Sequence, residues 1–209
     1  MRRSVALPIG VVVAVLLVVL VLSQLLLPPI AASKIEHRLT KDGGDAQVSL
    51  HAFPALRLLF QHGDSIDVTG SGLTVQLGSG GQKVLQKLDH FGAAHIHLTD
   101  VRSGPLVTQS FNLDKQSGQH VYEVSVRASF TPSALASYLG SSVGGGLGGL
   151  FGGIAGGLVA GNQPVPVAVE VQMVSNDGAP RVVSGAGTVA GVPMGPVLEA
   201  VVAAIVARL

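Results

Sequence analysis

The stretch HVYEVSVRASF, residues 120–130, alternates between apolar and polar side chains from Tyr122 onward. Its apolar members are Tyr122, Val124, Val126, Ala128 and Phe130, and the residues between them are polar or charged. A period of two over this length predicts a β-strand with one face on a core and the other in water. The fold class then depends on what surrounds this strand.

Shorter alternating runs lie on both sides of it. They occupy residues 47–51, 66–69, 73–77, 94–99, 165–173 and 181–189. We expect Gly70-Ser71-Gly72 to kink one long strand over 66–77, and Asn176-Asp177-Gly178 to turn between the last two strands. Helices are expected over 83–89 and from Thr131-Pro132-Ser133, where a cap and an N1 proline coincide, through Leu139. Because regular strand–helix–strand alternation is missing, we predict an α+β fold with an antiparallel sheet.

The N-terminus has the pattern of a membrane anchor. Arg2 and Arg3 precede an uncharged apolar run over 5–22, which resumes over 25–30. A helix over 5–22 would rise about 27 Å, close to the hydrocarbon thickness of a bilayer. Because Ile30-Ala31-Ala32 is only a fair cleavage site, we favour a retained single-pass anchor over a cleaved signal peptide. The arginine pair then stays cytoplasmic, and the rest of the chain lies on the extracytoplasmic side of the cytoplasmic membrane.

Composition restricts the possible partners. The chain has no cysteine, which excludes disulfides, thiol chemistry and a lipidated cysteine. Charged residues make up 12% of it and aromatic residues 4%. Soluble domains usually carry about twice that share of charge, so we expect part of the surface to meet lipid or to line an internal groove. The charges form no basic stripe, which makes nucleic acid an unsuitable partner.

Three regions follow from these patterns. Residues 1–30 form the anchor, 31–190 the exported domain, and 191–209 a C-terminal apolar helix. The domain contains a glycine-rich insertion, 140–161, whose glycines recur every fourth residue. That insertion fits a mobile loop, a flap that dips into the membrane or covers a groove, or a second span, in that order of preference.

Catalytic motifs are missing from the sequence. No serine stands in a G-x-S-x-G elbow, and no phosphate-binding loop is present. His95 and His97 would share one strand face with Asp100 nearby, but no third close ligand accompanies them. We therefore predict no enzyme activity, no cofactor and no metal site.

Several short landmarks resemble one protein family. They are Phe53-Pro54 before Gly63, then Leu73-Thr74-Val75, Leu88-Asp89, the run 94–101, Gly104-Pro105-Leu106, and the strand and helix over 121–139. Over residues 28–190 the chain resembles the LmeA-like family of exported or anchored phospholipid-binding proteins of actinobacterial envelopes. The glycine-rich insertion and the C-terminal helix do not map onto that family.

The resemblance implies a long curved antiparallel sheet wrapped around helices, similar to tubular lipid-binding domains, with an apolar groove for acyl chains. The lipid-binding residues would be Phe53, Leu56, Arg57, Leu59, Phe60, Tyr122, Val124, Val126 and Phe130. Arg57 would meet a head group at the rim of the groove, and Pro54 would set the turn. The alternative for each apolar residue of 53–60 is a place in the core beneath a strand connection.

The implied function is that of a membrane-anchored, extracytoplasmic phospholipid-binding protein that supports envelope lipid or glycan assembly. Its expected partners are phospholipid and the membrane. Two other classes stay open, a non-catalytic envelope scaffold and a metal-dependent hydrolase that uses His95 and His97.

Overall fold

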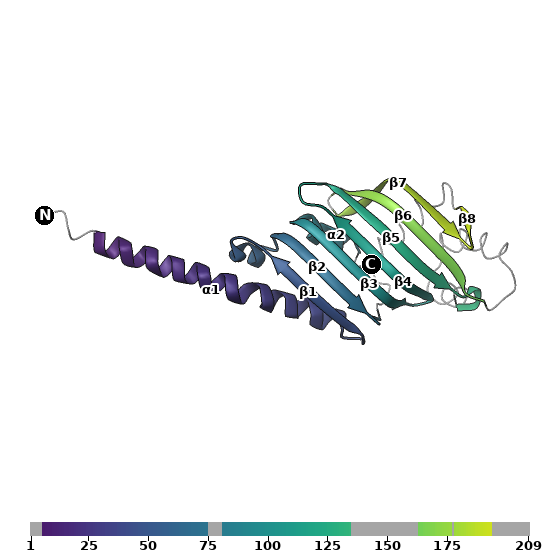
Figure 1. Ribbon diagram of the computed structural model, residues 1–209, viewed down its shortest axis with the longest axis horizontal. Helices are drawn as coiled ribbons and strands as arrows, with labels where there is room; N and C mark the ends of the chain where they lie inside the picture. The colour runs from purple at the N-terminus through teal and green to yellow at the C-terminus, as the bar shows by residue number, and fades with distance from the viewer. Residues whose placement is uncertain (1–5, 75–80, 135–162, 177, 194–209) are drawn as a thin grey trace.

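The computed structural model describes residues 6–74, 81–134, 163–176 and 178–193. In these residues a long N-terminal helix, α1 (Ala6–Leu39), precedes a large open sheet of eight strands (Figure 1). The predicted apolar N-terminal helix is confirmed, and the rest of the described chain is mostly β. The glycine-rich insertion, the C-terminal helix, and the second half of the helix expected from Thr131 to Leu139 lie outside the described residues.

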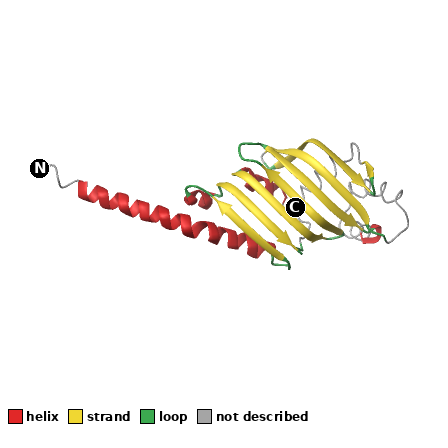
Figure 2. Ribbon diagram, in the orientation of Figure 1, coloured by secondary structure: helices red, strands yellow, loops and turns green. Residues whose placement is uncertain are grey.

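The strands follow one another across the sheet in chain order. They are β1 (Asp45–His51), β2 (Gly63–Ser71), β3 (Phe91–Ser103), β4 (Leu106–Lys115), β5 (Val121–Phe130), β6 (Val165–Asn176), β7 (Ala179–Val189) and β8 (Val192–Pro193). A 3₁₀ helix, η1 (Ala55–Phe60), joins β1 to β2. The helix α2 (Gly81–Asp89) follows β2 in the chain and precedes β3 (Figure 2).

The prediction of a wholly antiparallel sheet is wrong at one pair of strands. β2 and β3 are parallel, with Ser65 opposite Ala93 and Val68 opposite Ile96, whereas the other neighbouring strands are antiparallel. Parallel neighbours need a crossover of a dozen or more residues, and the chain from 72 to 90, which contains α2, provides it. The sheet is therefore mixed.

The strand predicted over 66–77 is shorter than expected. β2 ends at Ser71, and Gly72 then adopts a positive φ of 64°. Leu73 is fully buried, and Thr74 forms an isolated parallel bridge with Arg102 of β3. The predicted kink is thus the end of the strand, because the left-handed backbone at Gly72 turns the chain out of the ladder.

One face of the sheet carries the core. A row of paired apolar residues crosses six strands at one level, namely Val48, Val68, Ile96, Leu113, Val124 and Val171. Leu85 and Leu88 of α2 are buried in the same cluster. The opposite face is polar, since Glu123, Arg127 and Glu170 are exposed there. This division is the one that the alternation in β5 predicted.

The end of α1 covers the edge of the sheet. Ala31, Ile35 and Leu39 recur every fourth residue and pack on the core cluster, and Ala32 is buried in it. Glu36 Oε1 accepts a hydrogen bond of 2.7 Å from the backbone N–H of Val48 in β1. The first strand is thereby protected along its open side. The rest of α1 projects away from the sheet (Figure 1).

Candidate functional site

A half-buried apolar strip runs across the core face of the sheet, and we call it the open strip. It consists of Ile96, Leu98, Phe111, Val126 and Val167, each partly buried against the core cluster. Leu98 pairs with Phe111, and Phe111 with Val126, so these side chains are neighbours on one face. Among the described residues at the middle of the sheet, these side chains are the partly exposed ones on the apolar face.

The four predicted site residues on β5 all lie on this face. Val126 belongs to the open strip, whereas Val124 and Phe130 are each 6% exposed and Tyr122 is 1% exposed. In this arrangement Val126 is accessible, and the other three form the floor around it. The alternation predicted that these residues share one face, but it could not rank them by exposure.

The other five predicted site residues lie elsewhere. Residues 53–60, which we call the elbow, connect β1 to β2 at the edge of the sheet beside α1, several strands away from β5. Phe53 is 72% exposed, Leu59 63%, Phe60 75% and Leu56 39%. The structure therefore separates the predicted site into two surfaces. The alternative of a core position applies to none of these four side chains.

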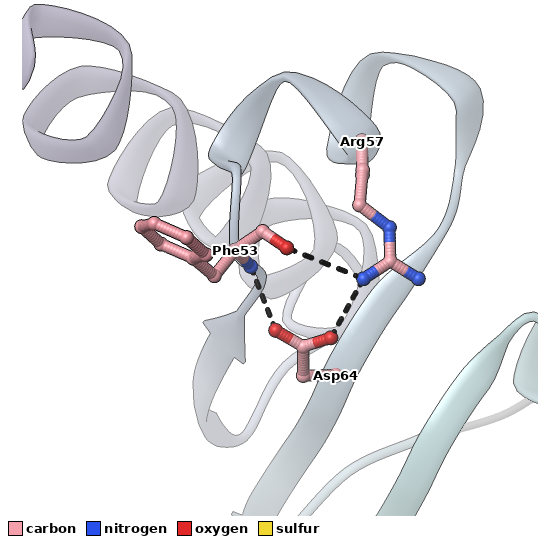
Figure 3. Close-up of polar contacts among 3 residues, drawn as sticks. All are labelled: Phe53, Arg57 and Asp64. Carbon is pink, nitrogen blue, oxygen red and sulfur yellow. Dashed lines mark hydrogen bonds and ion pairs between the residues drawn. The ribbon is translucent and has the colours of Figure 1, made fainter. Parts of the chain in front are cut away.

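Asp64, the second residue of β2, holds the elbow in shape. Its Oδ2 accepts a hydrogen bond of 2.7 Å from the Phe53 N–H, and its Oδ1 pairs with Arg57 Nη1 at 2.8 Å (Figure 3). Arg57 Nη1 also donates to the Phe53 carbonyl oxygen at 3.4 Å. The ring of Phe53 points away from this pair (Figure 3). Arg57, predicted to meet a head group, is about half exposed and keeps its other guanidinium nitrogens unpaired among the described residues.

The elbow also rests on α1. With the Gln24 amide oriented to satisfy both groups, its nitrogen donates to the Ala52 carbonyl at 3.3 Å and its oxygen accepts from the Ala55 N–H at 3.0 Å. Ala52 and Ala55 are buried, and Leu58 packs on the core cluster. The elbow is thus fixed at the level of residue 24 of the helix. Its other large apolar side chains, Phe53, Leu56, Leu59 and Phe60, are exposed.

A polar cluster that the sequence did not reveal lies beneath the core face, near the end of α2. Asp89 accepts hydrogen bonds of 2.6 Å from the Tyr122 hydroxyl and from Ser175 Oγ. Lys115, 5% exposed, donates to the carbonyl of Phe91 at 2.8 Å and to that of Leu88 at 3.4 Å. The one available signal was a lysine in phase with Leu113 at the end of β4.

The electrostatics of this cluster follow from burial. Desolvation lowers the pKa of Lys115, and the nearby Asp89 carboxylate opposes that effect. Desolvation and the hydrogen bond to Asp89 raise the pKa of Tyr122 well above its usual range. All of the described buried side-chain nitrogen and oxygen atoms have hydrogen-bond partners. The cluster joins α2 to the sheet, and its groups are occupied by one another.

The histidines of β3 lie on the polar face. His95 Nδ1 contacts Asp114 Oδ1 at 2.8 Å, and His97 Nδ1 contacts Asn112 Oδ1. Among the described residues, no group of three or more histidine, aspartate or glutamate side chains is arranged to hold a metal ion. A hollow beside them is lined mainly by polar side chains, including Ser110, Ser125 and Glu170.

Comparison with protein families gives a match over most of the chain. A family model described as LmeA-like phospholipid-binding matches residues 24–208. No curated protein and no solved structure matches the chain. The matched range begins inside α1, at the residue that binds the elbow, and includes every strand of the sheet.

Proposed function

The chain belongs to the LmeA-like phospholipid-binding family, and from that premise we propose that it binds phospholipid acyl chains on the core face of its sheet. The observation that supports this proposal best is the open strip. Its five apolar residues lie on one face of four neighbouring strands, are partly exposed and carry no charge. Removing apolar surface from water contributes about 25 cal/mol per Å², so a long acyl chain needs no dedicated polar partner to bind there.

In this proposal Val126 contacts the lipid directly, and Tyr122, Val124 and Phe130 form the surface beneath it. The sheet and its helices act as a groove of the kind seen in tubular lipid-binding domains. Head-group selectivity is weak, because the apolar face offers few charged side chains to recognise a head group. The protein binds its lipid without catalysing a reaction.

We further propose that α1 keeps the protein on the membrane. One helix in the described residues, within α1, is long and apolar enough to cross a bilayer, and little of it is buried. Arg2 and Arg3 precede the apolar run and favour a cytoplasmic N-terminus. The sheet then lies on the extracytoplasmic side, where it handles phospholipid for envelope lipid or glycan assembly.

Native mass spectrometry of the full chain, purified in detergent from the cells that made it, tests the binding. We expect phospholipid to remain bound to the folded protein and to be replaced by added phosphatidylglycerol or phosphatidylethanolamine. A folded protein that carries no phospholipid and takes none up would contradict the proposal and would favour a scaffold. Stoichiometric metal in the same sample would favour a hydrolase.

A further inference from the structure

The exposed side chains of the elbow are unusual for a connection between two strands. Phe53, Leu59 and Phe60 each expose well over half of their surface, and Leu56 adds to the same segment. The backbone that carries them is held by Asp64, Gln24 and the buried Ala55. A segment anchored in this way presents its apolar side chains as a preformed surface, and such a surface marks a site of interaction.

The position of the elbow along α1 indicates what it meets. Gln24 binds the elbow two residues after the apolar run 5–22, which alone spans about 27 Å of helix. The hydrocarbon core of a bilayer is about 30 Å thick, with head-group regions beyond it. If α1 crosses the membrane with its arginines on the cytoplasmic side, the elbow lies where the helix leaves the hydrocarbon on the other side.

The surface of α1 beside the elbow is also suited to lipid. Leu25, Leu26 and Ile30 are 66%, 56% and 62% exposed, and the first charged residue after Arg3 is Lys34. The two polar side chains in this part of the helix are satisfied within the protein, because Ser23 Oγ donates to the Leu20 carbonyl at 2.7 Å and Gln24 binds the elbow. Neither side chain needs water at this level.

The charged groups of the elbow fit the same position. Arg57 and Asp64 form an ion pair at the base of the elbow, which leaves no net charge to be desolvated. The remaining guanidinium nitrogens of Arg57 can reach a lipid phosphate in the head-group region. A second protein would not require this alignment of exposed apolar side chains with the end of a membrane-spanning helix.

We propose that the elbow inserts into the outer leaflet of the bilayer that α1 spans, with Phe53, Leu56, Leu59 and Phe60 below the head groups and Arg57 among them. Helices and loops of this kind sink about 5–10 Å into the interface. The insertion fixes the edge formed by β1 and β2 against the membrane, and it gives the domain one orientation on its anchor. The inference rests on the anchored arrangement proposed above, but it does not depend on where the sheet holds its lipid.

Site-specific labelling can test this, because the natural chain has no cysteine. Full-length Phe60→Cys and Leu59→Cys are labelled with nitrobenzoxadiazole and reconstituted in vesicles of phosphatidylethanolamine and phosphatidylglycerol. The control is Val183→Cys on β7, which is 62% exposed and far from α1 across the sheet. At all three positions the side chain points outward, so each variant should fold.

We expect the labels at 59 and 60 to emit at shorter wavelength than the label at 183. Brominated acyl chains should quench them several-fold more strongly than the control, and aqueous iodide several-fold less. Equal quenching by iodide at 60 and at 183 in vesicle-bound protein would overturn the inference. Phospholipid carried by the same labelled proteins is measured separately by native mass spectrometry, so a failure of groove binding and a failure of elbow insertion give different results.

Discussion

Tyr122 shows what a single buried hydroxyl does in this sheet. The side chain is 1% exposed on the core face, and its hydroxyl donates to Asp89 Oδ1 at 2.6 Å. Asp89 ends α2 and also accepts from Ser175 on β6, so one carboxylate links the helix to two strands. A short hydrogen bond to a carboxylate is stronger than one between neutral groups. Tyr122 therefore stabilises the core face, and its hydroxyl is occupied by Asp89.

Replacing Tyr122 with Phe should destabilise the full chain by about 1–2 kcal/mol, because Asp89 loses a charge-assisted partner. The measurement is chemical unfolding in detergent. Burial raises the Tyr122 pKa, so its stabilisation is complete below the unfolded value of about 10 and declines above it. The difference between wild type and variant should shrink at higher pH. Exposed Ser184→Ala is the control, and equal stability of wild type and Tyr122→Phe would contradict this account.

The histidines of β3 provide a second test at this scale. His95 and His97 contact Asp114 and Asn112 on the polar face, away from the open strip. Changing both histidines to Ala should leave the bound phospholipid unchanged, with a stability loss of less than about 1 kcal/mol, since exposed pairs contribute little. Lipid is measured by native mass spectrometry and metal by elemental analysis. If the wild type holds a stoichiometric metal that the double variant lacks, the metal-dependent hydrolase becomes the favoured function.

At the scale of elements, the sequence predicted those with an unbroken period. Strands over 165–173 and 181–189 and the helix over 83–89 are confirmed as β6, β7 and α2. β4 escaped prediction because a register shift between Thr108 and Ser110 reverses the phase of its alternation. The parallel pairing of β2 and β3 was also not predicted. Pairing partners depend on the path of the chain from 72 to 90 and not on periodicity.

The positions of the candidate site residues could be predicted to the same extent as the elements that carry them. The face of β5 followed from its period, but the exposure of each residue on it depends on neighbours that the sequence does not place. The elbow was recognised as apolar, whereas its position beside Gln24 of α1 arises only when β1 is packed on that helix. The Asp89 cluster joins residues 86 positions apart and left no local pattern.

The anchor is tested at this scale by the mass of the mature protein. α1 contributes Ala31 and Ala32 to the core cluster, and Gln24 supports the elbow. Cleavage after Ala31 or Ala32 would remove Gln24 and Ala31, so we expect the membrane-bound protein to keep its N-terminal residues. Intact mass spectrometry should give about 21.2 kDa. A soluble product that begins at Ala32 or Ser33 would reject the retained anchor.

At the scale of the whole molecule, the two surfaces that we propose as lipid contacts are arranged around one sheet. The anchor and the elbow hold the β1 edge, and the open strip lies further along the sheet, on β3 to β6. This arrangement would let a lipid move from the membrane onto the core face without the domain leaving its anchor. The central claim is that the acyl chains bind to that face and not to the other.

Two tryptophan substitutions on opposite faces test this claim most directly. Val126→Trp fills the open strip on β5, and Ala168→Trp adds a larger volume to an exposed position on the polar face of the neighbouring strand β6. Both proteins are compared with wild type by native mass spectrometry, after circular dichroism shows that they are folded. We predict that Val126→Trp lowers phospholipid occupancy several-fold and that Ala168→Trp leaves it unchanged. Equal occupancy in the two folded variants, or loss only in Ala168→Trp, would contradict binding on the core face.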